Sequence, residues 1–318
     1  MSARRLAALG AAAAIVVVVL VLALPADGRP LPGAGACTIF PKDNHWNVRV
    51  DGLPKAKISD AIVNRIGRDE NAHADFGSGK FEGGPIGIPF KVVKNSQKKV
   101  PVSFEFDDES DRGSYPIPPN VPIEGGSSSD GDRHVLLVNK DKCRLYELFS
   151  AFPQDGGKRW KAGSGAIWDL RSNKLRPKGF TSADAAGLPI LPGLARYDEV
   201  KRGSIDHALR FTVQETRRKY VYPARHFASD SNDADLPPMG MRFRLRKGFD
   251  SSGFGPQSRV VLEALKRYGM ILADNGSNFF ISGAPDKGWN NDDLARLGDV
   301  RGSDFEVVDT SSLPTPGK

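Results

Sequence analysis

Two acidic residues inside predicted strands are the best candidates for general acid–base chemistry. Glu147 lies among apolar residues, and Asp169 directly follows Trp168. A carboxyl group among apolar side chains has a raised pKa and can act as a general acid. Two such groups across a concave sheet predict a glycoside hydrolase. The alternative is structural: Glu147 pairs with a cross-strand cation, and Asp169 caps the turn at residues 172–173.

A second set of residues suits a polysaccharide lyase. A lyase needs a His or Tyr base, with an Arg and an amide that neutralise a uronate next to the proton removed. The alternative is that each histidine is a hydrogen-bonded residue at the end of a strand. The residues that fit the lyase role are His207, Arg210, Tyr222 and His226.

Cations and tryptophans supply candidate ligand-binding residues. Arg242, Arg244 and Arg246 alternate with apolar residues, so they share one face of a predicted strand and could bind an acidic polymer. The alternative is a solvated outer face. Trp46 and Trp168 could stack on sugar rings, or they could belong to the core.

The sequence predicts no cofactor, although two acidic clusters could hold Ca²⁺. Oxygen ligands gather at residues 107–111 and again at residues 230–235. Neither cluster has the spacing of an EF-hand, so a solvated loop is the alternative. Nucleophile elbow, P-loop, H-E-x-x-H and C-x-x-C motifs are absent from the sequence.

The amino-terminal residues predict export. Arg4 and Arg5 precede an uncharged apolar stretch from Leu6 to Leu24. Its length suits both a long cleaved signal peptide and an uncleaved anchor, so residues 1–26 have two interpretations. The arginine pair favours a cytoplasmic amino terminus with the rest of the chain outside. We therefore expect an extracellular or membrane-tethered protein that contacts the membrane only through this segment.

The sequence contains two cysteines, Cys37 and Cys143. In an oxidising compartment two cysteines favour one disulfide, here between the start of the mature domain and a strand near its middle. The alternative is two buried free thiols. Because export is predicted, we expect the disulfide.

Periodicity predicts many short strands and few helices. Apolar spacing indicates helices at residues 58–66 and 256–268. Polar turns predict three hairpins, and Thr181 to Asp184 resembles a capping box. We expect an antiparallel β-sandwich, jelly-roll or concanavalin-like, with a few short helices. The hairpins pair residues 88–93 with 100–106, 134–139 with 144–149, and 270–273 with 278–282.

The chain divides into a globular part and flexible flanks. Residues 27–36 are rich in Pro, Gly and Ala and are predicted to be a linker. Residues 37–310 are predicted to form a single domain, followed by a loose tail at 311–318. The formal net charge of +7 is compatible with an anionic polymer. Nucleic acid is disfavoured by export and by the lack of an aromatic and basic RNA-binding signature.

Four segments of the sequence resemble a widespread group of secreted bacterial proteins whose activity is not characterised. The similarity spans most of the mature chain. It implies export and a single domain, and it supplies no catalytic residue. The segments that carry it are residues 39–47, 115–119, 179–189 and 268–276.

Together these features predict an exported carbohydrate-active protein, a glycoside hydrolase or a lyase that acts on extracellular polysaccharide. Two alternatives remain open, a non-catalytic glycan-binding protein and a structural protein of the cell envelope. The sequence does not determine the substrate or the oligomeric state.

Overall fold

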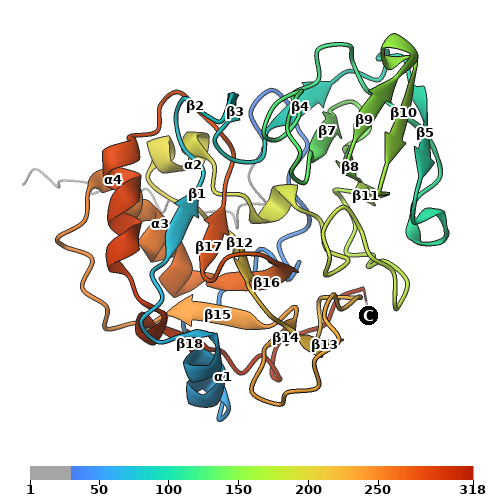
Figure 1. Cartoon of the computed structure of the whole chain (residues 1–318). Coiled ribbons are helices and arrows are strands. Elements are labelled where there is room, and N and C mark those ends of the chain that lie inside the picture. The colour runs from blue at the N-terminus through green and yellow to red at the C-terminus, as the bar shows by residue number, and fades with distance from the viewer. Residues whose placement is uncertain (1–29, 318) are drawn as a thin grey trace, which may run out of the picture.

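The computed structural model describes residues 30–317, and short strands dominate it. The predicted signal peptide or anchor at residues 1–26 lies outside this range. Within residues 30–317, no helix has both the length and the apolar character needed to cross a bilayer. Figure 1 shows two groups of strands beside each other, one of them flanked by helices.

The first group is a mixed six-stranded sheet. Strands β12 and β16 are parallel neighbours, whereas β15 pairs antiparallel with β16 and β18. The order across the sheet is β1 (His73–Asp75), β17 (Phe280–Ser282), β12 (Leu209–Val213), β16 (Met270–Asn275), β15 (Arg242–Leu245) and β18 (Phe305–Val307).

Helices pack around this sheet. The predicted helices are confirmed as α1 (Ser59–Ile66), which contacts β18, and α3 (Pro256–Arg267), which contacts β15. Helix α3 begins with a proline in its first turn and buries an apolar stripe. The shorter helices are α2 (Tyr197–Arg202) and α4 (Asn291–Ala295), and both contact α3.

The second group consists of two four-stranded sheets that face each other. The inner sheet has the order β11 (Ser164–Asp169), β8 (Arg144–Phe149), β7 (Val135–Asn139) and β4 (Phe90–Val93). The outer sheet has the order β6 (Gly113–Tyr115), β5 (Val100–Phe104), β10 (Arg159–Ala162) and β9 (Phe152–Gln154). The antiparallel pairing of β7 with β8 confirms one predicted hairpin.

Two apolar cores hold these layers together. The smaller core lies between the inner and outer sheets and includes Leu137, Leu148 and Trp160. The opposite face of the inner sheet contributes Leu136 and Leu145 to the larger core, which also contains the six-stranded sheet. Since successive strand residues point to opposite faces, the inner sheet is buried on both sides. This explains its continuous apolar runs.

Short elements complete the fold. Strand β2 (Lys80–Phe81) pairs with β3 (Gly84–Pro85), and β13 (Arg217–Tyr220) pairs with β14 (Pro238–Met239). The 3₁₀ turns are η1 (Asp107–Glu109), η2 (Asp155–Gly157), η3 (Leu191–Gly193), η4 (Arg296–Asp299) and η5 (Gly302–Asp304).

The predicted mainly β fold with a few short helices is confirmed. The strands are not antiparallel throughout, however, because each large sheet contains parallel pairs. The two other predicted hairpins are wrong. Strands β4 and β5 belong to different sheets and face each other across the smaller core. Strand β12 lies between β16 and β17, and the turn residue Gly276 donates its N–H to Val213 in β12. Residues 181–184, which resemble a capping box, are coil followed by a bend and do not begin a helix.

The disulfide between Cys37 and Cys143 is confirmed, with a sequence separation of 106 residues. It joins the amino-terminal segment to the turn between β7 and β8. Leu31 and Ala34, in the predicted linker, are buried in the larger core. The amino-terminal segment is therefore anchored to the inner sheet both covalently and by packing.

Candidate functional site

The predicted hydrolase pair does not form. Glu147 and Leu145 lie on the face of the inner sheet that contributes to the larger core, whereas Asp169 and Ile167 lie on the opposite face. Asp169 also pairs with Arg171. The two carboxyl groups therefore cannot flank one groove.

Glu147 is fully buried and has a structural role. Its carboxyl oxygens accept hydrogen bonds from the backbone N–H groups of Ile190 and Leu191 and from the indole of Trp168, at 2.9–3.1 Å. Burial raises the pKa of Glu147 to about 7, and the two backbone N–H groups oppose this rise. Glu147 thus fixes the start of η3 to the inner sheet.

The predicted lyase residues are dispersed. The Nε2 atom of His207 is 3.0 Å from Glu199 in α2, and its Nδ1 atom is 2.8 Å from the carbonyl of Ala208. The hydroxyl of Tyr222 donates to the carbonyl of Pro316, and burial raises the pKa of Tyr222 to about 12. Arg210 instead contacts two carboxyl groups, Asp184 and Asp274, and His226 lies with these carboxyl groups at the wall of a cavity.

The predicted ligand-binding residues are buried, so their proposed exposure is wrong. Trp46 is 0% and Trp168 is 6% exposed, which leaves neither ring face free for a sugar. Arg242 donates to the carbonyls of His45, Val48 and Tyr268, and burial lowers its pKa to about 9. Arg242 on β15 therefore binds the backbone of residues 45–53, which we call the covering segment, and is not available to bind a polymer.

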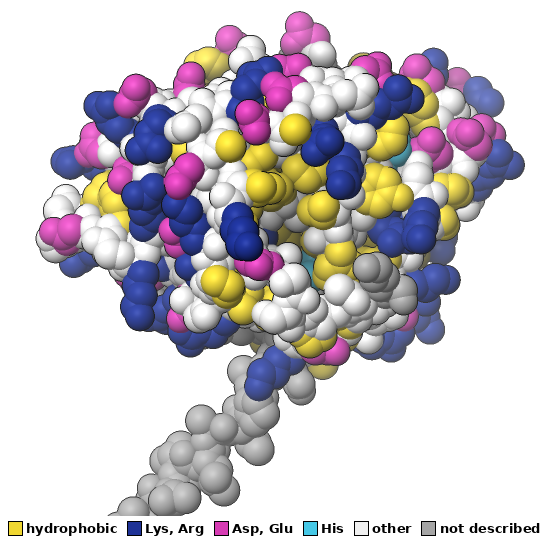
Figure 2. All heavy atoms as spheres, turned by 90° about the horizontal axis from the view of Figure 1, so that it is seen from below, with side chains coloured by type: hydrophobic (Ala, Val, Ile, Leu, Met, Phe, Trp, Pro, Cys, Tyr) yellow, Lys and Arg dark blue, Asp and Glu magenta, His cyan; other side chains and the backbone are white. Residues whose placement is uncertain are grey.

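Arg244 behaves in the same way. It donates to the carbonyls of Val50 and Leu53 and pairs with Glu306 on β18. Residues 45–53 consequently cover this face of the sheet. Figure 2 shows the cations of one molecular face spread between acidic side chains, with hydrophobic side chains near its middle.

The acidic clusters predicted for Ca²⁺ are divided among different partners. Asp111 accepts the N–H of Ile167 and pairs with Arg176, whereas Glu109 accepts the N–H of Thr181. Asp233 pairs with Arg65. Because these carboxylates bind separate protein partners, the structure does not support a shared Ca²⁺ site in either cluster.

Three ionisable side chains that the sequence analysis does not bring together form a cluster: Arg210 on β12, Asp274 on β16, and Asp184. Arg210 donates to both carboxyl oxygens of Asp184 at 2.8 and 2.7 Å, and to Asp274 at 3.2 Å. Its remaining nitrogen donates to Ser282 on β17 at 2.7 Å. One buried guanidinium therefore holds two carboxyl groups close together.

A β-bulge places Asp274 in this group. Phe211 pairs with Leu272, but Thr212 pairs with Asp274, so Ala273 is an extra residue in the ladder. In a regular strand Asp274 would share the face of Leu272. The bulge turns it to the face of Arg210, as bulges next to functional sites often do.

The two carboxyl groups of this pair differ in environment. Burial raises the pKa of Asp274 to about 8, the neighbouring charge of Asp184 adds to the rise, and Arg210 opposes it. Asp184 is 1% exposed and forms the bidentate ion pair with Arg210. A carboxyl with a raised pKa beside a second carboxyl that is paired with a guanidinium is the arrangement of an acid–base pair.

Both groups line a cavity of about 350 Å³. Asp132 and Glu109 add further carboxylates to its wall, and Phe106, 47% exposed, adds an aromatic ring. Polar groups that can bond hydroxyls also line it, namely Thr181, Ser182 and Asn275. The wall is acidic and partly aromatic.

His226 is a further lining residue with a defined tautomer. Its Nδ1 atom is 2.9 Å from the carbonyl of Ala185. A carbonyl only accepts hydrogen bonds, so Nδ1 carries a proton and Nε2 is the ring nitrogen that remains to accept one. His226 can therefore serve as a base in the cavity.

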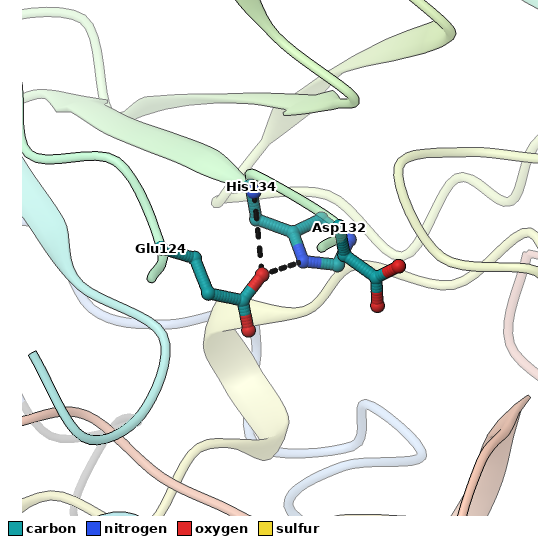
Figure 3. A group of neighbouring side chains, drawn as sticks. All are labelled: Glu124, Asp132 and His134. Atoms are coloured by element: carbon teal, nitrogen blue, oxygen red, sulfur yellow. Dashed lines mark hydrogen bonds and ion pairs between the residues drawn. The ribbon is translucent and has the colours of Figure 1, made fainter. Parts of the chain in front are cut away.

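Two more side chains, Glu124 and His134, lie close to Asp132 of the cavity wall (Figure 3). The Nδ1 atom of His134 is 2.5 Å from Glu124, and its Nε2 atom is 2.9 Å from the carbonyl of Ala183. Although burial opposes it, the charge of Glu124 raises the pKa of His134 to about 9. Within residues 30–317, Glu124, Asp132 and His134 form the group whose ligand atoms lie close enough, within 4.8 Å, to hold a metal ion.

Comparisons with protein-family models, curated proteins and solved structures found no match to this chain. The site therefore has to be interpreted from its own chemistry.

Proposed function

We propose that the protein is an exported glycoside hydrolase whose acid–base groups line the cavity between the inner sheet and the six-stranded sheet. The observation that carries this proposal is the pairing on the cavity wall of Asp274, whose pKa is raised by burial to about 8, with Asp184, which forms an ion pair with Arg210. A disulfide-bonded fold suits the oxidising exterior that the amino-terminal sequence predicts.

In this mechanism Asp274 donates its proton to the glycosidic oxygen as the bond to the anomeric carbon breaks. The Nε2 atom of His226 removes a proton from the attacking water. Arg210 holds Asp184 in place through the bidentate ion pair, and the charge of Asp184 contributes to the raised pKa that lets Asp274 act as the acid.

The charge of the cavity selects among substrates. Four carboxyl groups line it, and none of its lining residues is Lys or Arg. A uronate would meet repulsion there, which disfavours the lyase alternative. Hydroxyl-bearing neutral sugars, or sugars with a free amino group, suit the wall better, and Phe106 offers a ring face for stacking.

A polysaccharide panel tests the proposal. The purified protein should release reducing ends from neutral or amino-bearing polysaccharides, without the ultraviolet absorbance of unsaturated products. Asp274→Asn should reduce the rate by about 10²–10⁴-fold because it removes the general acid. Asp235→Asn, an exposed residue outside the cavity, should retain the rate.

Unsaturated products from uronate polymers would contradict the hydrolase proposal and favour a lyase. Full activity in Asp274→Asn would contradict the role of that residue.

A further inference from the structure

Glu124, Asp132 and His134 come from the loop that leads into β7, and His134 directly precedes that strand. Their donor atoms, one imidazole nitrogen and two carboxylate oxygens, lie within 4.8 Å of one another. Figure 3 shows Glu124 turned toward the imidazole, with Asp132 beside it. The set mixes nitrogen and oxygen donors, so it is more than a cluster of acids.

The imidazole of His134 is held in the orientation typical of a metal ligand. Its Nε2–H donates to the carbonyl of Ala183 at 2.9 Å, and the ring is buried. Metal-binding histidines usually donate their second N–H to a carbonyl or carboxylate, which fixes the ring and the tautomer. The Nδ1 atom is therefore the one that can point at a ligand.

The surroundings of this group contain unbalanced negative charge. Arg210 is occupied by Asp184, Asp274 and Ser282. The positive charge that contacts Glu124 is the proton on Nδ1 of His134, at 2.5 Å. Asp132 is exposed, and its carboxylate lies within 4.8 Å of the ligand atoms of both Glu124 and His134. A divalent cation in place of that proton would neutralise Glu124 and Asp132 together.

We propose that Glu124, Asp132 and Nδ1 of His134 bind one divalent transition-metal cation, with Zn²⁺ as the best match. Imidazole is a ligand that Zn²⁺ favours, whereas Ca²⁺ takes oxygen ligands alone. Three protein ligands would leave a fourth position open, and one of these ligands, Asp132, lines the cavity. Binding of this cation does not depend on the hydrolase mechanism.

Metal titration of the purified, chelator-treated protein tests the site. Calorimetry with Zn²⁺ should show one equivalent, and Co²⁺ should give the visible absorption of a low-coordinate site. Asp132→Asn should weaken binding by at least about tenfold, because it removes one ligand and changes no buried contact. Asp130→Asn, an exposed residue two positions earlier in the same loop, is the matched control and should bind as the wild type does.

Glu124→Gln provides a second variant, checked for folding by its circular dichroism spectrum, and should also lose affinity. No saturable binding by the wild type would overturn the proposal. Equal affinity in Asp132→Asn and wild type would overturn it as well, because the ion would then be bound elsewhere. Neither readout requires enzymatic activity, so the metal site can be tested whether or not the protein is a hydrolase.

Discussion

Buried carboxyl groups are stabilised in two different ways in this protein. Glu147 accepts N–H groups from Ile190, Leu191 and Trp168, with no cation in contact. Asp184 has a bidentate partner in Arg210. Hydrogen bonds compensate only part of the burial cost of a charge, whereas a paired guanidinium compensates more of it. Accordingly, burial dominates at Glu147 and raises its pKa.

Glu147 predicts a pH dependence of stability. Its pKa rises from 4.5 to about 7 on folding. Between these values the unfolded carboxyl loses its proton while the folded one keeps it, so stability falls as pH rises and levels off above pH 7. Relative to Glu147→Gln, which does not titrate, the wild type should lose at most about 3 kcal/mol across this range.

Urea unfolding at several pH values checks this difference. The exposed Glu105→Gln variant should follow the wild type throughout. A constant gap between wild type and Glu147→Gln from about pH 4.5 to 8 would contradict the prediction.

Asp274 predicts a pH dependence of activity. The proposed general acid has a pKa of about 8, so the rate should fall about tenfold per pH unit above that value. Asp184→Asn removes the neighbouring negative charge and leaves Asp274 as the only carboxyl group of this pair that contacts Arg210. Both changes favour ionised Asp274, so the alkaline limb should move to lower pH.

The pH–rate profile of Asp184→Asn checks this shift, with Asp235→Asn as the control. An alkaline limb at the same pH in Asp184→Asn and wild type would show that the two carboxyl groups are not coupled.

At the scale of elements, register decides what each side chain can do. The bulge at Ala273 brings Asp274 to the face of Arg210. On β15, Arg242 points to the same face and binds the backbone of the covering segment. Alternation along β15 predicts two faces of different polarity, but polarity alone does not reveal that residues 45–53 cover the basic face.

Arg242→Lys tests the role of this covering contact. Lysine keeps the charge but lacks the fork of donors that reaches the carbonyls of His45, Val48 and Tyr268 together. We expect a loss of about 1–3 kcal/mol in the free energy of unfolding, measured by denaturant titration.

The exposed Arg218→Lys is the matched control and should change stability by less than about 0.5 kcal/mol. If Arg242→Lys is as stable as this control, the three carbonyl contacts contribute nothing to folding.

At the scale of the whole molecule, the sandwich-like pair of sheets lies beside the six-stranded sheet (Figure 1). Residues of both groups of strands line the cavity. Asp132 precedes the inner sheet, and Asp274 belongs to the six-stranded sheet. Asp184 lies on the segment that connects the two groups of strands. The relative position of these groups therefore sets the geometry of the candidate site.

The disulfide should stabilise this arrangement. Its loop spans 106 residues, and loss of a bridge over such a loop typically costs about 2–4 kcal/mol through the unfolded chain. The Cys37→Ser/Cys143→Ser variant should unfold at a correspondingly lower temperature. Reduced wild-type protein should match it, and an unchanged melting temperature in both would contradict the prediction.

Several features could be predicted from the sequence because they are local or compositional. Helix α1, helix α3 and the β7–β8 hairpin follow from apolar spacing and short turns, which depend on near neighbours. The pairing of Cys37 with Cys143 follows from the count of two cysteines together with predicted export. The sequence also indicates Arg210 as a candidate site residue, but it does not indicate that Asp184 and Asp274 are its partners.

The tertiary structure alone decided which distant segments meet. The sequence around Asp184 indicates a helix cap, and the sequence around Asp274 indicates a hairpin turn. Such local patterns contain no information about partners far away in the chain. Periodicity records which side of a strand is apolar, but the strand that pairs with it, and the segment that covers it, depend on packing between residues far apart in the chain. The position of β12 between β16 and β17 and the bulge at Ala273 both depend on such long-range packing.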